Sequence, residues 1–415
     1  MSTHESVLPP ALVLGSGITA LGVVRGLGRR GIPRHVLSAD PVLVRASRWY
    51  RPPPGGQRLR ELSDLAGYLR SLPLEGGVLI PTSDHAALAA AGLPPDLAAR
   101  FPTSQAPASV LAELLDKEKL RRLLAEHDVP HPRTIPVDGP LDLEDLGDVE
   151  VERLFVKPRD SQEFSRRLGV KALRAGSREA LRTALDRVRR EGLPVVLQEY
   201  VPGPAPNHYF LDGFVDRAGV VRARFARRRL RAFPPEFGNS CATISVPLEE
   251  MAPAASDLER LFAAVGYRGP YDAEFKLDER TGVFRLLEIN VRAWWQVEFA
   301  ALCGVDVVPM CYRDALGFPV GEVRDYDVGV KWMLPYRDFI ACRRLLASGQ
   351  IRLSRWVGSW LTSYWGEFAA DDPLPGLAAG ADLLGRRLLK RSSARSRVRR
   401  SVSPPAAGHP SVPAP

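Results

Sequence analysis

The amino-acid sequence predicts an α/β protein: a small parallel α/β layer comes first, and an α+β region with antiparallel strands follows. Residues 11–41 read as a strand, a glycine turn, an amphipathic helix and a second strand, which together make one β-α-β unit. GGVLIPTSD, residues 76–84, predicts a further buried strand. From LFVKP at 154–158 onward, short strands separated by turns replace this pattern, so antiparallel pairing is expected there.

Helices are expected between and after these strands. Residues 109–129 read as one helix, closed by the helix-breaking Pro130 and Pro132. The expected parts are an N-terminal α/β domain over residues 1–105, a second domain over 106–330, a helical C-terminal extension over 331–389 and a disordered basic tail over 390–415. In the extension, DDPLP at 371–375 predicts an ordered turn.

Charge is unevenly distributed along the 415 residues. The net charge is +9, but residues 384–415 contain eight Lys or Arg and no acid, so the rest of the chain is nearly neutral. We therefore expect no nucleic-acid binding by the body, and contact with anionic surfaces only by the tail. No secretory signal and no apolar run of membrane-spanning length is present, which predicts a cytoplasmic protein. The four cysteines show no CxxC spacing, which predicts reduced, buried thiols and no zinc site.

One stretch, LLEINVRAWWQ at 286–296, places an acid, an amide and an arginine at alternate positions. In a strand, Glu288, Asn290 and Arg292 would line one face if the strand continued that far. A three-residue turn at 280–282 would place Glu274 of the preceding strand opposite Glu288. Two facing carboxylates repel unless a cation lies between them, and oxygen ligands of this kind suit Mg²⁺.

Asn290 would add a neutral oxygen to such a metal site, and Arg292 could reach a phosphate. The same spacing also fits a hairpin whose charged face only meets water. The hairpin alone does not decide between these two interpretations.

With these motifs in view, the chain resembles the ATP-grasp superfamily, in particular its ATP-dependent carboxylate-amine ligases, from LVLGSG to about AALCGVDVVPMCYRDALG. LLEINVR is similar to the E-x-N-x-R pattern of the family. The resemblance implies that Glu274, Glu288 and Asn290 hold Mg²⁺, or Mn²⁺, against ATP.

The resemblance also implies roles for residues outside the hairpin. Lys117 and Lys157 match the family lysines that contact ATP phosphates, and we expect Lys157 to matter more because it leaves a strand rather than a helix. VVLQEYVPG resembles the strand beside adenine, where the backbone at Glu199, Tyr200 and Val201 would read the purine edge. His208 matches a polar position near the ribose.

Six arginines follow one another closely in RARFARRRLRAFPPEFGNS. As a strand, this segment would aim Arg227, Arg229 and Arg231 at one face, where they could bind an acidic substrate or an acyl phosphate. A solvated strand explains the first two equally well. Arg231 precedes a loop that resembles the substrate side of related ligases, so Arg231 and Arg292 are the predicted catalytic arginines.

The predicted activity is that of a ligase that joins a small carboxylate to a small amine through an acyl phosphate, using ATP. Three alternatives stay open: an ATP-grasp carboxylase or kinase-like enzyme, a nucleotide-binding protein without catalysis, and a nicotinamide-dependent oxidoreductase. The last rests on GSGITALG and on Asp40, whose spacing departs from G-x-G-x-x-G. The substrates and the oligomeric state are not readable from the sequence.

Overall fold

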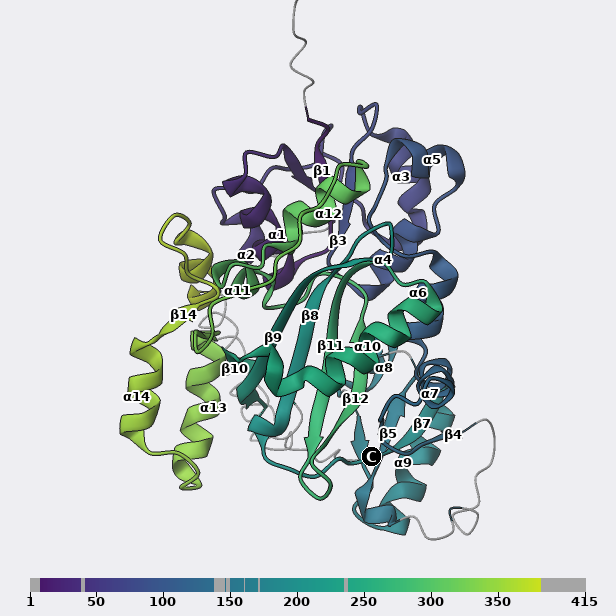
Figure 1. Cartoon of the computed structure of the whole chain (residues 1–415), viewed down its shortest axis with the longest axis vertical. Helices are drawn as coiled ribbons and strands as arrows, with labels where there is room; N and C mark the ends of the chain where they lie inside the picture. The colour runs from purple at the N-terminus through teal and green to yellow at the C-terminus, as the bar shows by residue number, and fades with distance from the viewer. Residues whose placement is uncertain are drawn as a thin grey trace, which may run out of the picture.

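Three β-sheets organise the chain (Figure 1). A computed structural model describes residues 8–38, 42–137, 146, 150–159, 161–170, 172–234 and 238–381. The acidic loop after residue 137, Asp40 and the basic tail fall mostly or wholly outside these ranges. Among the helices within them, none combines the length and apolar content needed to cross a bilayer.

The first sheet is the predicted parallel layer, and it has the strand order β2-β1-β3. All four side chains of β1 are buried, as expected for a strand covered on both faces. The strands are β1 (Ala11–Leu14), β2 (Arg34–Val36) and β3 (Val78–Pro81), and the helices are α1 (Gly17–Arg29), α2 (Val42–Arg45), α3 (Leu65–Ser71), α4 (Asp84–Ala91) and α5 (Pro95–Arg100). The second predicted strand ends earlier than expected, at Val36.

The helix predicted over 109–129 is two helices, so that prediction is wrong. They are α6 (Ala108–Leu115) and α7 (Lys117–Glu126). The break lies at Asp116, whose backbone is extended and whose carboxylate accepts hydrogen bonds from the N–H groups of Glu118 and Lys119. Such a cap starts a new helix. Lys117 therefore occupies the first turn of α7.

The second sheet is antiparallel, with the order β4-β7-β5-β6. Helix α9 packs Leu181, Leu185 and Val188 into the core beneath it. The strands are β4 (Thr134–Val137), β5 (Leu154–Pro158), β6 (Leu173–Arg174) and β7 (Val195–Glu199), and the helices are α8 (Ser161–Leu168) and α9 (Arg178–Arg190).

The third sheet has seven strands in the order β12-β11-β8-β9-β10-β13-β14. Its strands are β8 (His208–Val215), β9 (Val221–Phe233), β10 (Asn239–Ser245), β11 (Gly269–Asp278), β12 (Val283–Asn290), β13 (Lys331–Met333) and β14 (Ser363–Trp365), with α10 (Ala252–Val265) packed against it. The pairs are antiparallel except β13 with β14. The predicted C-terminal extension thus adds two strands to the sheet of the second domain.

Four further helices are α11 (Val297–Leu302), α12 (Val307–Ala315), α13 (Pro335–Ala347) and α14 (Leu353–Leu361), and the described residues 374–381 are also helical. Helices α11 and α12 share one hydrophobic core with α1 and the first sheet. Gly22 of α1 permits this contact, because a Cβ there would lie 2.8 Å from a methyl group of Val297. Helices α11 and α12, which follow β12 in the chain, therefore pack against the N-terminal domain. All four cysteines are buried and free, as predicted.

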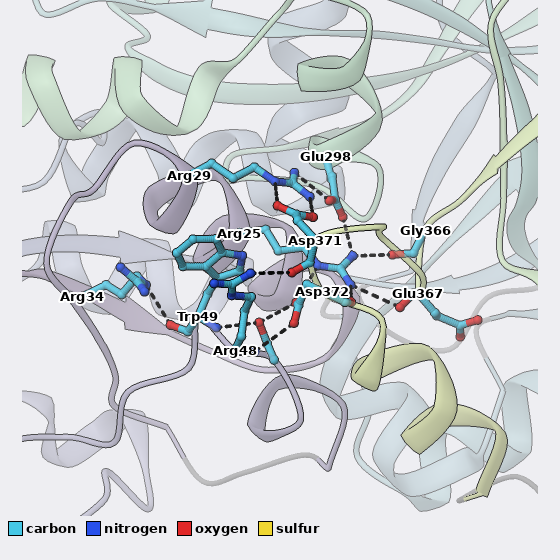
Figure 2. A network of polar contacts seen from close by, with 11 residues as sticks. Arg25, Arg29, Arg34, Arg48, Trp49, Glu298, Gly366, Glu367, Asp371 and Asp372 are labelled. Atoms are coloured by element: carbon cyan, nitrogen blue, oxygen red, sulfur yellow. Dashed lines mark hydrogen bonds and ion pairs between the residues drawn. The ribbon is translucent and has the colours of Figure 1, made fainter.

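Arg25 of α1 is a buried cation that ties three distant segments together (Figure 2). Its guanidinium pairs with Glu298 of α11 at 2.8 Å and with Asp372 at 2.9 Å, and it donates to three main-chain carbonyl groups near Asp372. Asp372 also accepts from the Ser47 hydroxyl and the Arg48 N–H, at 2.6 and 2.8 Å. The ordered turn predicted at DDPLP is present, and these bonds fix it.

Candidate functional site

The hairpin β11–β12 places Glu274 opposite Glu288, as predicted. The predicted turn is wrong: Asp278 pairs with Val283, so four residues rather than three lie between the strands. A register shift after Glu274 compensates, because Leu286 and Leu287 together stand opposite Phe275. An extra residue in one strand of a pair is a β-bulge, and it returns the two carboxylates to facing positions.

Each of these carboxylates has a partner from another element. The Oε1 atom of Glu288 lies 3.2 Å from Nζ of Lys117, at the start of α7. The Oε2 atom of Glu274 lies 3.1 Å from Nε2 of His208, on β8. The side chains of Glu274 and Glu288 are 26% and 38% exposed, so each can still reach a ligand from solvent.

The two predicted lysines converge on Glu288. Burial opposes ionisation of that carboxyl, but the positive charges of Lys117 and Lys157 outweigh both burial and the nearby Glu274, and the pKa of Glu288 is lowered. Only 9% of the Lys117 side chain is exposed, so Lys117 is held in place by its surroundings although it lies on a helix and not on a strand. Lys157 is half-buried on β5.

Asn290 ends β12, and Arg292 lies beyond the strand. The Asn290 amide donates to Asp272 Oδ2 at 3.0 Å, and its oxygen accepts from Arg292 Nη2 at 3.0 Å. Arg292 Nε lies 3.5 Å from Asp84 Oδ1, at the start of α4. Arg292 therefore lies between the hairpin and the N-terminal domain, and it reaches back to Asn290 although it does not continue the strand.

Two arginines of β9 face the hairpin across Phe210. Arg227 is buried and pairs with Asp212 at 2.6 Å and with Asp272 at 3.0 Å, and its Cζ lies 3.8 Å from the centre of the Phe210 ring. Arg229 lies over the same ring at 5.6 Å and donates to the Ser240 hydroxyl. The sequence left both arginines open between substrate binding and a solvated strand, and a solvated strand does not describe the buried Arg227.

Arg231 does not share this arrangement, and the expectation that it shares a face with Arg227 and Arg229 is wrong. Its Nε donates to Asp338 of α13 at 2.6 Å, and its Nη2 donates to Ser359 of α14 at 3.0 Å. Two register shifts between β9 and β10, around Ala242, interrupt the alternation of side chains after Arg229. Arg231 thus joins the third sheet to the C-terminal helices.

The strand predicted to lie beside adenine is β7. The N–H groups of Glu199 and Tyr200 donate to main-chain carbonyls at 2.8 and 2.6 Å, so neither is available to a purine. We therefore expect only the main-chain carbonyl groups of this segment and the N–H of Val201 to contact adenine. The Glu199 side chain pairs with Arg280 at 3.1 Å, and that pair joins β7 to the turn of the hairpin.

Two basic side chains at this site have lowered pKa values. Burial and the charge of Arg229 lower the pKa of His208 to about 4, against the opposing pull of Glu274, so its imidazole is neutral near pH 7. Burial, together with Arg229, lowers the pKa of Lys276 to about 8. Lys276 Nζ lies 3.3 Å from the Tyr200 hydroxyl and 4.6 Å from the centre of its ring.

Lys276 lies two residues after Glu274 on β11, and no role was predicted for it from the sequence. Asp212 was also missed, although an acid inside the apolar run YFLDGFV is a visible signal of a buried partner. Asp212 is fully buried, and burial raises its pKa against the pull of Arg227.

The donor set at the hairpin fits a hard divalent cation. Glu274 and Glu288 supply facing carboxylates, and the Asn290 oxygen keeps a second lone pair besides the one bound by Arg292. Within the described ranges no cluster of three His, Cys, Asp or Glu side chains could form a metal site by itself. A metal here would need oxygens from a ligand in addition to the protein.

Comparison with known proteins gives one sequence relative and several structures with a similar fold. No family model matches the chain. The sequence is 25% identical over 221 residues to a D-aspartate ligase from Enterococcus faecium, which covers 50% of this chain and 51% of that protein. The chain thus spans about half the length of the curated relative it matches.

Solved structures share most of the fold. A carboxyaminoimidazole ribonucleotide synthase from Aspergillus clavatus, complexed with ATP, aligns with a TM-score of 0.57 and 15% identity over 77% of this chain and 80% of that one. An L-amino acid ligase from Bacillus licheniformis aligns with a TM-score of 0.55 and 17% identity over 76% and 77%. The chain therefore has the ATP-grasp fold that its sequence predicted.

Proposed function

We propose that this chain, which has the ATP-grasp fold, is an ATP-dependent ligase that joins a carboxylate to an amine. The observation that carries the proposal is the convergence of Lys117 and Lys157 on Glu288, opposite Glu274. One cation from helix α7 and one from the second sheet act on two facing carboxylates of the third sheet, and a nucleoside triphosphate with its counter-ion would need both signs of charge. The names of the D-aspartate ligase and the L-amino acid ligase favour an amino acid as one substrate.

The proposed reaction has two steps. An oxygen of the substrate carboxylate attacks the γ-phosphorus of ATP, the bond to the β,γ-bridging oxygen breaks, and ADP leaves. The nitrogen of the amine then attacks the carbonyl carbon of the acyl phosphate, inorganic phosphate leaves with the electron pair of the C–O bond, and the nitrogen loses a proton. The first step is needed because phosphate is a far better leaving group than hydroxide.

The protein's own residues would position the reactants and balance charge. Lys117 and Lys157 would contact the phosphates of ATP, and Arg292, which lies between the hairpin and α4, would hold the acyl phosphate. Carbonyl groups of β7 and the N–H of Val201 would contact adenine. His208, neutral near pH 7, would lie near the ribose without adding charge.

Glu274, Glu288 and Asn290 would hold Mg²⁺ or Mn²⁺. When bound, the cation supplies positive charge that neutralises phosphate oxygens. The catalytic role predicted for Arg231 is less well supported, because its guanidinium is already paired with Asp338. We assign Arg231 a role in holding the C-terminal helices.

A screen of amino-acid pairs tests the proposal. The purified chain would be incubated with ATP, Mg²⁺ and one carboxylate, with and without an amine, beginning with D-aspartate. ADP and phosphate would be measured together with the mass of the product. We expect ADP release to require both partners and the product to be an amide.

Other outcomes would identify the alternatives. ADP release without amine would indicate a kinase-like or carboxylating enzyme. ATP binding without ADP release across the screen would indicate a nucleotide-binding protein. Turnover of a nicotinamide cofactor would contradict the ligase proposal and would indicate an oxidoreductase.

A further inference from the structure

The C-terminal helices carry an unusual concentration of exposed apolar side chains. Among the described residues, eight of the sixteen exposed large hydrophobic side chains fall within residues 339–377. They are Phe339, Leu353, Val357, Leu361, Tyr364, Trp365, Leu374 and Leu377. Scattered exposed apolar residues are ordinary, but a concentration of them in one part of the fold indicates an interaction surface.

Three of these side chains form a stripe along α14. Leu353, Val357 and Leu361 follow one another at intervals of four residues, so they lie on one face of the helix, and they are 59%, 48% and 82% exposed. No residue of α14 is buried. Helices α13 and α14 lie at one edge of the molecule (Figure 1), far from the β4–β7–β5 sheet.

The face of α14 next to the stripe is held firmly by the protein. The indole N–H groups of Trp356 and Trp360 donate to Asp338 of α13 at 3.2 and 2.7 Å, and Asp338 is fully buried. Edge-on ring contacts continue from Trp360 to Trp365 at 5.4 Å. The stripe is therefore presented by a fixed helix, and its exposure is a property of the folded chain.

The segment that carries the stripe is basic. Residues 339–366 contain four arginines and no acidic residue, and Arg343, Arg344, Arg352 and Arg355 are all exposed. After four acidic residues between positions 367 and 382, residues 384–415 contain eight more basic residues and no acid. A short amphipathic helix with exposed aliphatic and aromatic residues and a basic surround has the chemistry of a helix that lies in the interface of an anionic membrane.

We propose that α14, with its neighbours Tyr364 and Trp365, docks on an anionic lipid surface. Leu353, Val357 and Leu361 would enter the boundary between headgroups and acyl chains, and the arginines would pair with lipid phosphates. Tyr and Trp side chains favour this boundary because each combines an apolar ring with a polar group. A nucleic acid would use the arginines but would leave the aliphatic stripe exposed to water, so the stripe favours a membrane.

Vesicle co-sedimentation of the full chain tests this proposal. The probes are vesicles of phosphatidylcholine alone and of phosphatidylcholine mixed with phosphatidylglycerol. The test variant combines Leu353→Gln, Val357→Gln and Leu361→Gln. The matched control combines Val220→Gln, Val283→Gln and Phe318→Gln, which replaces three exposed apolar residues elsewhere and leaves the basic tail unchanged.

We expect the wild-type chain and the control to bind the anionic vesicles. The test variant should bind at least about tenfold more weakly, because it lacks the three exposed apolar side chains that would enter the lipid boundary. Added salt should weaken wild-type binding without abolishing it. Circular dichroism would show that both variants fold.

Equal binding of the test variant and the control would overturn the proposal, as would failure of the wild-type chain to bind anionic vesicles. A wild-type oligomer that the test variant dissociates without lipid, or retention of duplex DNA in place of vesicles, would assign the stripe to another partner. The proposal is independent of the ligase activity, which the test variant should retain.

Discussion

Glu288 Oε1 lies 3.2 Å from Lys117 Nζ, and Glu274 stands opposite Glu288 on the neighbouring strand. The carboxylate of Glu288 therefore has a cation on one side and a like charge on the other. A metal cation between the two carboxylates would relieve this repulsion. Glu288 is therefore the most informative residue to change, because it would contact both Lys117 and the metal.

Glu288→Gln should reduce turnover by at least about a hundredfold, because the amide keeps the shape but removes the charge that would hold a metal against the phosphates. Glu274→Gln should be milder, since its amide can still bond His208. Steady-state kinetics over a range of Mg²⁺ concentrations measure both. Near-normal activity of Glu288→Gln at ordinary Mg²⁺ would remove the metal site from this hairpin.

Lys117→Ala and Lys157→Ala should each cost about 2 to 4 kcal/mol in transition-state stabilisation, comparable to losing one fixed electrostatic donor. The sequence favoured Lys157, but the direct contact between Lys117 and Glu288 makes comparable losses the better expectation. The quantity to compare is kcat/KM for ATP. Lys119→Ala, an exposed neighbour on α7, is the control and should have no effect.

Asp338→Ala should destabilise the fold by about 3 to 5 kcal/mol, because it leaves the Arg231 guanidinium buried without its partner. Two indole N–H groups would lose their acceptor as well. Urea unfolding followed by tryptophan fluorescence measures the change. Arg231→Met should show a smaller loss of stability, and the KM of each substrate should stay near the wild-type value if Arg231 is structural. A large rise in one KM with unchanged stability would restore its predicted substrate role.

Asp372→Ala should also cost about 3 to 5 kcal/mol, since it removes one of the two carboxylates paired with the fully buried Arg25 and the acceptor of the Ser47 hydroxyl. Its neighbour provides a matched control: Asp371 pairs with Arg29 where both side chains are partly exposed, so Asp371→Ala should cost only about 0 to 1 kcal/mol. Thermal unfolding of the two variants compares them directly. Similar losses for both would mean that Arg25 finds another acceptor.

Part of the site could be predicted because side chains along a strand alternate between its two faces. Alternation with period two was enough to group Glu288 with Asn290 and to pair Glu288 with Glu274. The turn was predicted one residue too short, and the pairing survived because Leu287 forms a bulge. Turn length and bulge position depend on how the hairpin packs, so the sequence alone could not supply them.

One further feature could have been predicted from the sequence, whereas the long-range contacts could not. The break between α6 and α7 could have been found, because Asp116 followed by a helical segment is an N-cap signal. The contact between Arg231 and Asp338 joins residues 107 positions apart, and no local pattern predicts it. The same holds for Arg25 and Asp372, 347 positions apart.

His208 should make the fold less stable in acid. Burial, followed by the charge of Arg229, lowers its pKa to about 4, whereas an unfolded histidine titrates near 6.5. The unfolded chain therefore binds a proton that the folded chain excludes, and stability falls as the pH drops below about 6.5. Between pH 7 and pH 5 this effect should remove about 2 kcal/mol from the free energy of unfolding.

His208→Gln should remove that part of the pH dependence, because glutamine can still bond Glu274 but does not titrate. Urea unfolding at pH 7 and pH 5 gives the difference between wild type and variant at each pH. His127→Gln, whose main-chain carbonyl rather than its ring accepts from Arg260, is the control and should keep the wild-type dependence. A His208→Gln variant that loses as much stability as the wild type over this range would show that the folded imidazole titrates near its ordinary pKa, so that Glu274 balances burial and Arg229 at this position.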